Sequence, residues 1–237
     1  MKTYCISDIH GHYRNLLAFR DSLKEDDKVY VLGDAIDKGE NPIACLKLVM
    51  NDSRFEMLIG NHEYMMWQFL YAQKNALDTL EETYIQWVDW NRGGDTLKPY
   101  LQLEEAEREK IYSYIEDLPL NFPEVIVGGH KFYLVHSLPE SETQIRMKDI
   151  AYNDNIIYNY VWDRRLIDEY LKPFEDRTVI VGHTAVEEYD WNKVAPYYYG
   201  DDIAKAAYID IDGGLAYQLP QSKLIALCLD DMTYELY

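Results

Sequence analysis

Apolar runs of strand length alternate with amphipathic stretches along the first sixty residues. Residues 3–7, 28–32 and 55–59 are short and mostly apolar, and polar or glycine-containing segments separate them. Between them, apolar side chains recur every three or four positions at residues 16–23 and 43–50, which is the spacing of a helix with one buried face. Strands that alternate with helices in this way predict βαβ units and an α/β fold in which helices cover the sheet.

The middle of the chain has helical spacing and no strand pattern. Met65, Met66, Phe69 and Leu70 share one helical face, and residues 103–115 have the pattern of a charged amphipathic helix. We expect a helical insert at about residues 64–118, packed on one side of the sheet.

Strand patterns return after the insert, and no repeat, linker or low-complexity segment divides the chain. Gly128 and Gly129 predict a tight turn between the first two of these strands. Residues 1–237 are therefore expected to form one domain. The later strand candidates are residues 125–127, 132–135, 178–181, 207–211 and 224–229.

The chain is strongly acidic, with 23 Lys and Arg against 42 Asp and Glu and a net charge of −19. Proteins that bind nucleic-acid phosphates or anionic membranes need a basic face, so neither partner is expected. The three cysteines, Cys5, Cys45 and Cys228, form no disulfide framework and no metal-binding spacing. The first residues lack a signal-peptide pattern, and no apolar run approaches the ~20 residues of a membrane span, so we expect a cytoplasmic protein.

Five short polar motifs follow predicted strands. Each alone is explained by a turn, a helix cap or a structural imidazole. Their shared position matters because α/β folds gather ligand-binding groups at the carboxyl ends of strands. The motifs are Asp8-Ile9-His10-Gly11, Gly33-Asp34-Ala35-Ile36-Asp37-Lys38-Gly39, Gly60-Asn61-His62-Glu63, Val135-His136-Ser137 and Val181-Gly182-His183-Thr184.

Together the motifs supply nitrogen and oxygen donors of the kind that bind divalent cations. Asp8 and His10 are two residues apart at a strand end, so we expect their side chains on the same side. Asp34 is placed to bridge two cations, and the absence of thiolates from the motifs disfavours a closed structural zinc site. The candidate metal ligands are Asp8, His10, Asp34, Asn61, His136 and His183.

The order of these motifs resembles that of the calcineurin-like metallophosphoesterases, and more narrowly their bacterial phosphoprotein phosphatase branch (PPP-type serine/threonine phosphatases). Residues 90–97, the segment Trp162-Asp163-Arg164 and residues 209–214 resemble further motifs of that branch. The resemblance spans nearly the whole chain, with Gly-Asn-His-Glu as its most specific element. It implies a four-layer sandwich in which helices flank two mixed β-sheets.

The resemblance also implies roles for individual residues. His62 matches the general acid of the family, Asp37 the carboxylate that orients it, and Arg164 a phosphate-binding arginine. The implied reaction is attack on phosphorus by a hydroxide that two metal ions activate, with manganese expected first and iron or zinc as alternatives. The implied ligand sets are Asp8, His10 and Asp34 for one ion, and Asp34, Asn61, His136 and His183 for the other.

Two positions depart from the pattern of the family. Lys38 stands where an arginine is usual, which replaces a planar, two-pronged donor by a point charge. Ile59 stands before Gly-Asn-His-Glu, where many members carry an arginine, and this weakens the case for a phosphoprotein pocket. Lys38 and Arg92 are further candidates for binding phosphate, and Arg92 is also explained as a solvated loop residue.

The predicted function is hydrolysis of a phosphomonoester, with a serine/threonine protein phosphatase as the first expectation. The substrate would be a phosphorylated protein or a small phosphoester. A dinucleoside polyphosphate hydrolase of the symmetrical diadenosine tetraphosphate type is the alternative. A non-catalytic scaffold is disfavoured because every ligand position is retained, and a nuclease is disfavoured by the acidic charge. Five aromatic residues of the insert could stack a nucleobase or belong to the core: Tyr64, Trp67, Tyr71, Trp87 and Trp90.

Overall fold

Two mixed β-sheets of five strands each form the centre of the protein. The computed structural model describes residues 1–150, 153–164 and 174–237. In the first sheet the strand order is β10-β9-β1-β2-β3, and in the second it is β4-β5-β6-β8-β7. The first sheet comprises β1 (Thr3–Ile6), β2 (Lys28–Val31), β3 (Phe55–Met57), β9 (Ile225–Cys228) and β10 (Tyr234–Leu236). The second comprises β4 (Asn121–Val127), β5 (His130–Val135), β6 (Thr178–Val181), β7 (Tyr197–Tyr198) and β8 (Tyr208–Asp210).

Side-chain alternation along the strands builds the predicted sandwich. In the first sheet, Cys5 and Tyr30 belong to a buried cluster that also contains Leu134 and Ile180 from the second sheet. Ile6, which follows Cys5 in β1, belongs instead to the cluster that includes the covering helices. Successive strand residues point to opposite faces, so each sheet has one face toward the other sheet and one toward helices. The expected α/β sandwich of two mixed sheets is confirmed.

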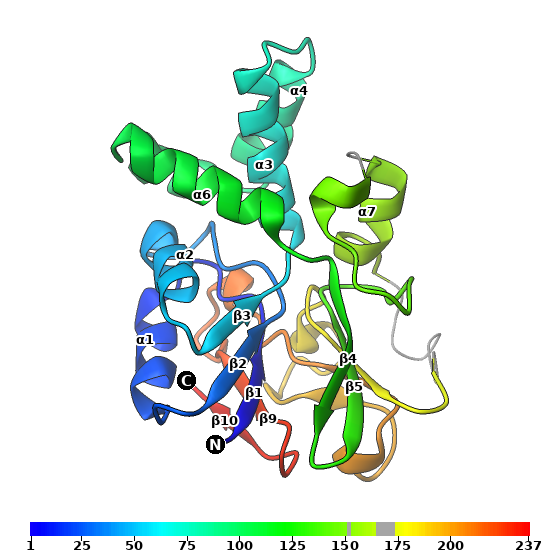
Figure 1. Ribbon diagram of the computed structural model, residues 1–237. Coiled ribbons are helices and arrows are strands. Elements are labelled where there is room, and N and C mark those ends of the chain that lie inside the picture. Colours follow the sequence, from blue (N-terminus) through cyan, green and yellow to red (C-terminus); the bar gives the residue numbers. More distant parts are fainter. Residues whose placement is uncertain (151–152, 165–173) are drawn as a thin grey trace.

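Parallel pairing places the ends of several strands at one edge. β1, β2 and β3 are mutually parallel, as are β5, β6 and β8. Figure 1 shows helices α1 (Tyr13–Ser22) and α2 (Pro42–Asn51) covering the outer face of the first sheet, and α7 (Asp154–Val161) on the opposite side of the molecule. The loops that follow the parallel strands therefore meet where the two sheets lie side by side.

The segment between β3 and β4 is helical, as predicted. The first helix begins at Asn61, three residues before the predicted start of the insert. Figure 1 shows α3, α4 and α6 standing beyond the ends of the strands rather than flat against one side of a sheet, which corrects the expected position. The elements are α3 (Asn61–Lys74), α4 (Leu80–Tyr84), the π-helical turn η1 (Ile85–Asp89), α5 (Gly94–Leu101) and α6 (Glu105–Asp117).

The aromatic residues of the insert separate into two groups. Tyr64, Trp67 and Trp87 are buried and Tyr71 is half-buried, which agrees with a place in the core. Trp90 differs, since its side chain is 76% exposed. Only this last indole is therefore open to solvent at the end of η1.

Several shorter features complete the fold. The predicted turn between β4 and β5 is confirmed, since Gly128 and Gly129 both have positive φ (58° and 87°), as a two-residue hairpin of this type requires. The strands β7 and β10 were not expected. Within the described residues no helix combines the length and the apolar character that crossing a membrane requires. The other short helices of the described residues are η2 (Met147–Ile150), η4 (Val186–Glu188), η5 (Ile203–Lys205) and η6 (Leu215–Tyr217).

Candidate metal centre

The loops after β1 and β2 bring Asp8, His10 and Asp34 together. His10 Nε2 lies 3.7 Å from Asp8 Oδ1 and 3.6 Å from Asp34 Oδ2. The sequence analysis expected Asp8 and His10 on the same side because side chains alternate along a strand, but this reason is wrong. The strand β1 ends at Ile6, and Asp8, His10 and Asp34 have the positive φ angles of left-handed backbone (50°, 45° and 54°). Left-handed backbone at non-glycine residues is uncommon and clusters at functional sites.

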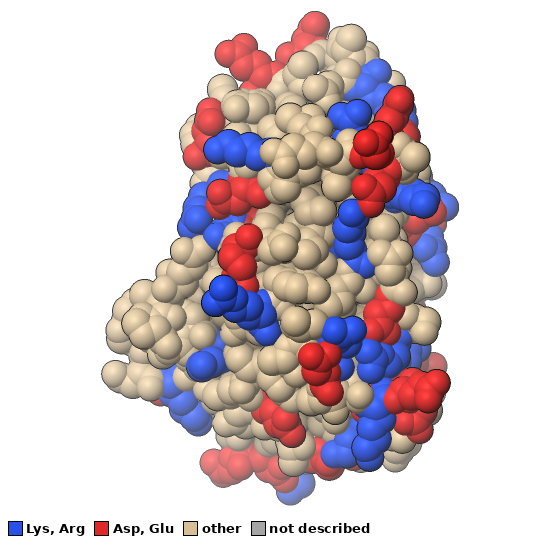
Figure 2. Space-filling model, turned by 90° about the vertical axis from the view of Figure 1, so that its left-hand side faces the viewer, with Lys and Arg blue, Asp and Glu red and all other residues tan. Residues whose placement is uncertain are grey.

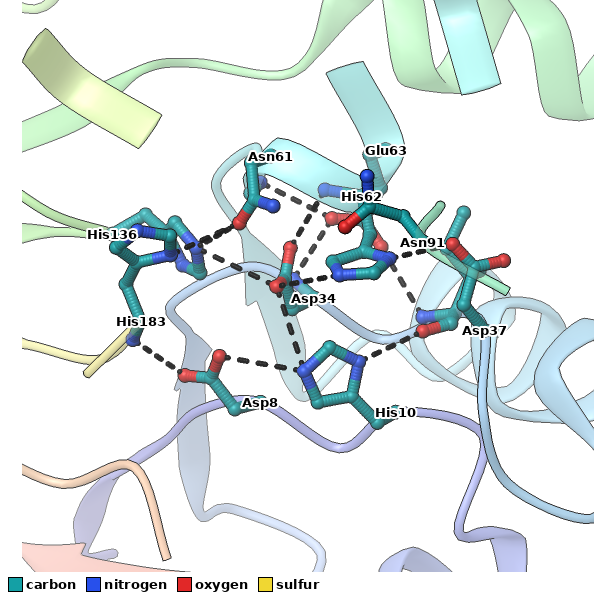
Figure 3. A network of polar contacts seen from close by, with 12 residues as sticks. Asp8, His10, Asp34, Asp37, Asn61, His62, Glu63, Asn91, His136 and His183 are labelled. Carbon is teal, nitrogen blue, oxygen red and sulfur yellow. Dashed lines mark hydrogen bonds and ion pairs between the residues drawn. The ribbon is translucent and has the colours of Figure 1, made fainter. Parts of the chain in front are cut away.

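Asp34 lies at the centre of the cluster, as Figure 3 shows. Its Oδ2 is 3.6 Å from His136 Nε2 and 3.9 Å from His62 Nε2. Two groups of potential ligand atoms share this carboxylate, and within each group the atoms lie within 4.8 Å of one another. The groups are His10, Asp34 and His62, and Asp34, His136 and His183.

These two groups can be compared with the two ligand sets that the family resemblance implied. All six candidate ligands lie in one buried cluster, and the sharing of Asp34 is as expected. His62 rather than Asp8 completes the first of the two groups. Asp8 is turned partly away, because its Oδ2 accepts hydrogen bonds from the His183 backbone N–H (3.0 Å) and from the Ser7 hydroxyl.

Asn61 is not the N-cap of α3, and its amide oxygen lies near two imidazoles. The N-cap of α3 is Gly60, and Asn61 is the first helical residue. Its Oδ1 lies 3.0 Å from His136 Nε2 and 3.0 Å from His183 Nδ1. The amide oxygen thus points toward the two imidazoles (Figure 3).

The tautomers of these imidazoles indicate that a cation fits between them. His136 Nδ1 lies 2.6 Å from the Leu32 carbonyl, and His183 Nε2 lies 3.2 Å from the Trp162 carbonyl. A carbonyl only accepts, so these nitrogens carry the protons. Burial lowers the pKa of both imidazoles, and each neutral ring then turns a lone pair toward Asn61 Oδ1. A metal ion held by His136, His183 and Asn61 would accept these lone pairs and remove the repulsion between them.

His10 follows the same rule. Its Nδ1 lies 3.2 Å from the Ile36 carbonyl and therefore donates, which leaves the Nε2 lone pair facing Asp8 and Asp34. The donor set of carboxylate, amide and imidazole groups suits divalent ions such as manganese, iron or zinc. The described residues of the centre thus fit two adjacent cations.

His62 and Asp37 form a buried pair beside the centre. His62 Nδ1 donates to Asp37 Oδ2 at 2.6 Å, and its Nε2 faces Asp34. Burial, with the nearby Lys38 charge as the second cause, lowers the pKa of His62 well below its usual value. Burial raises the pKa of Asp37 to about 7.

The insert holds Asp37 through two residues that the sequence did not reveal as part of the site. Trp87 Nε1 donates to Asp37 Oδ2 at 2.9 Å, and the Thr96 hydroxyl donates to Asp37 Oδ1. A side chain at Gly93 would collide with the Trp87 indole, so this glycine admits the ring. Thr96 lies in the motif at residues 90–97 that carried part of the family resemblance. This motif was the one feature of the sequence that could have indicated Thr96 as part of the site.

Glu63 is another residue that the sequence analysis did not place. It is fully buried, and its carboxylate accepts hydrogen bonds from the backbone N–H groups of Asp34 (2.8 Å), Ala35 (2.9 Å) and Gly60 (3.1 Å). Burial and the neighbouring Asp34 charge raise its pKa. Its position three residues after the N-cap is that of a capping box, which was the local signal in the sequence. Glu63 therefore fixes the loop that carries Asp34 against the start of α3.

A cavity of about 70 Å³ opens onto the centre, and two of the three expected phosphate-binding cations reach it. Lys38 and Arg164 line this cavity, together with Asn91, which was not predicted. The Arg164 side chain is 52% exposed and pairs with Glu188 at 3.3 Å. Arg92 lies behind Lys38 instead, where it donates to the Lys38 carbonyl (3.1 Å) and pairs with Asp95 (3.0 Å). Ile59 is fully buried, so no cation enters from that position.

The buried carboxylates predict how cation removal depends on pH. Burial raises the pKa of each of them, so above pH 7 the folded protein without cations binds more protons than the unfolded chain and loses stability as pH rises. The buried imidazoles are neutral in both states in this range and contribute little. The carboxylates concerned are Asp34, Asp37, Glu63, Asp210 and Asp212, whereas the pKa of Asp8 rises only to about 6 and this group contributes little above pH 7.

We therefore expect the gain in melting temperature on adding manganese to EDTA-treated protein to be several degrees larger at pH 8.5 than at pH 7.0. Each additional proton bound in the folded state costs about 1.4 kcal/mol per pH unit, and about 1 kcal/mol shifts the midpoint by roughly 2–4 °C at this chain length. Differential scanning fluorimetry at both pH values measures the gain. An equal gain at the two pH values would contradict the raised pKa values.

Comparison with known proteins agrees with this geometry. Residues 1–187 match the family profile described as calcineurin-like phosphoesterase. A symmetrical bis(5'-nucleosyl)-tetraphosphatase of Actinobacillus succinogenes is 32% identical over 80 residues, which are 32% of this chain and 29% of that protein. The corresponding protein of Glaesserella parasuis serovar 5 is 26% identical over 145 residues, or 58% of this chain and 44% of that protein. The chain thus spans less than half the length of these curated relatives.

Solved structures share the fold. The crystal structure of a metallophosphoesterase from Sphaerobacter thermophilus superposes with a TM-score of 0.57 at 20% identity, covering 100% of this chain and 88% of that chain. The family profile covers 187 of the 237 residues and includes all six candidate ligands. The resemblance found in the sequence is confirmed, and the chain belongs to the calcineurin-like phosphoesterase family.

Proposed function

We propose that this protein hydrolyses phosphoric esters or anhydrides at a centre of two divalent cations. The observation that carries the proposal is the convergence of imidazole lone pairs on Asp34 and Asn61, with the opposite nitrogen of each ring tied to a backbone carbonyl or to Asp37. The proposed ligands are the six that the sequence indicated: Asp8, His10, Asp34, Asn61, His136 and His183. Manganese is the proposed metal, with iron or zinc as alternatives.

Each side chain has a task suited to its surroundings. Bound cations supply positive charge for the phosphate oxygens and lower the pKa of water toward neutrality. Arg164 and Lys38 line the cavity and offset the remaining charge of the phosphate group. His62 lines the same cavity and donates a proton to the departing oxygen, while Asp37 fixes its ring and stabilises the imidazolium form.

The proposed substrate is a dinucleoside polyphosphate. The curated relatives described above carry the name symmetrical bis(5'-nucleosyl)-tetraphosphatase, and Ile59 removes the arginine that many phosphoprotein phosphatases have beside the centre. A phosphorylated protein is the second candidate, since the 70 Å³ cavity accommodates little more than a phosphate group and Arg164 is open to solvent.

Nucleic acid is disfavoured because Lys and Arg side chains lie scattered among Asp and Glu on the face shown in Figure 2, without a continuous basic stripe there.

Replacing His62 by Asn tests the role of the general acid. We expect kcat for an alkyl phosphate to fall by roughly 10²–10⁴-fold, because an alkoxide needs protonation as it leaves. The loss on p-nitrophenyl phosphate should be smaller, and manganese content should be largely retained. Steady-state kinetics and elemental analysis measure both quantities. His130→Asn, an exposed histidine at the start of β5, is the matched control. Parental rates on both substrates would refute the assignment.

Replacing Trp87 by Phe tests the support that the insert gives to Asp37. The variant keeps an aromatic ring in the core and removes one hydrogen bond to the carboxylate, which corresponds to a loss of about tenfold in kcat. Because Asp37 acts through His62, alkyl phosphate hydrolysis should suffer more than aryl phosphate hydrolysis. Trp90→Phe, in the same segment but 76% exposed, should leave both rates unchanged. An equal loss on the two substrates would indicate a purely structural role.

A direct comparison distinguishes the two substrate classes. With manganese-loaded protein, we expect diadenosine tetraphosphate to be hydrolysed to ADP with a kcat/KM at least about tenfold above that of a phosphothreonine peptide. Chromatography of the nucleotides and phosphate release from the peptide provide the two measurements. The reverse ranking would identify the protein as a phosphoprotein phosphatase.

A further inference from the structure

A second cavity, of about 510 Å³, opens beside the metal centre. Its volume lies within the range of small-molecule sites. The walls come from the start of α1, the loop after β2, the insert and the segment around η6. Residues that characterise it are His12, Lys38, Glu40, Arg92, Gln218 and Leu219.

Lys38 joins this cavity to the metal centre, because its side chain lines both. Its backbone carbonyl accepts hydrogen bonds from Arg92 Nη2 (3.1 Å) and Gln218 Nε2 (2.5 Å), which hold the loop in place. Among the described residues no carboxylate pairs with the Lys38 ammonium, whereas Arg92 pairs with Asp95. An anion at the boundary between the cavities would therefore meet an available positive charge.

His62, the proposed general acid, lines the same cavity over the centre as Lys38. Figure 3 shows His136 and His183 at one end of the centre, Asp34 in the middle, and His62 with Asp37 at the other end. A general acid must lie within hydrogen-bond reach of the oxygen that leaves. Lys38 directly follows Asp37 and lines this cavity with His62, so a group that received its proton from His62 would lie near Lys38.

We propose that the 510 Å³ cavity binds the nucleoside phosphate that leaves during hydrolysis, an inference that rests on the proposed function. Water gives one proton to solvent, the resulting hydroxide bonds to phosphorus, the bridging P–O bond breaks, and the departing phosphate oxygen takes the Nε2 proton of the His62 imidazolium, whose Nδ1–H stays bound to Asp37. Lys38 and Arg92 then bind that phosphate. Glu40 and Asp95 line the same cavity and supply acceptors for ribose hydroxyls.

Replacing a residue that lines the cavity by a larger one tests the proposal. Leu219 is half-buried and lines the cavity, and Leu219→Trp adds bulk without removing a charged group. With manganese-loaded protein, we expect kcat/KM for diadenosine tetraphosphate to fall by about tenfold or more, and that for p-nitrophenyl phosphate to stay within about twofold. Leu101→Trp, on an exposed part of α5, should change neither value. A parental value with the dinucleotide, or an equal loss with both substrates, would overturn the proposal.

Product inhibition separates this proposal from the choice of substrate. ADP should inhibit hydrolysis of p-nitrophenyl phosphate, and both Leu219→Trp and Arg92→Gln should raise its inhibition constant by about tenfold. The inhibition constant of inorganic phosphate should be unchanged in Leu219→Trp, because phosphate alone binds at the centre. This pattern without turnover of the dinucleotide would leave the cavity assignment standing and refute the substrate. If no phosphoester is hydrolysed, calorimetry of ADP binding to the same variants gives the comparison. Unchanged ADP affinity in both variants would overturn the cavity assignment.

Discussion

The centre depends on hydrogen bonds that fix one nitrogen of each imidazole and so aim the other. The bond from His136 Nδ1 to the Leu32 carbonyl is the most informative, because it joins the end of β5 in the second sheet to the end of β2 in the first. Gly33, at φ 86°, makes room for it, since a side chain there would lie 2.8 Å from that nitrogen. The alignment of the two sheets thus sets the direction of the lone pair on His136 Nε2.

The insert is a structural part of the centre and not an appendage. Its π-helical turn carries Trp87 and the start of α5 carries Thr96, and both bind the carboxylate that orients His62. A buried carboxylate with too few donors would lose its charge or its position. Asp37 has three side-chain partners, of which two come from the insert, so the position of His62 depends on helices far away in the sequence.

Local patterns in the sequence were sufficient for most strands and for the six candidate ligands, because strand ends in an α/β fold converge. They were insufficient for β7, which has two residues, and for β10, whose side chains are all exposed. Local patterns also could not predict contacts between distant segments, since Trp87 and Thr96 bind Asp37 from 50 and 59 residues away in the sequence. Glu63 has the pattern of an ordinary capping residue, and only folding shows that it also binds the loop of Asp34.

An acidic protein that binds an anionic substrate needs a local reversal of charge. Three carboxylates line the cavity over the centre, those of Asp8, Asp34 and Asp212, together with the cations Lys38 and Arg164. With all three carboxylates ionised the lining is net negative, and two divalent cations, which favour the ionised carboxylates, would add four positive charges and reverse its sign. Because exposed charges are screened over about 8 Å at physiological ionic strength, the net charge of −19 repels a phosphate only weakly once it has reached the cavity. Cation binding would thus both relieve the buried carboxylates and create the attraction for substrate.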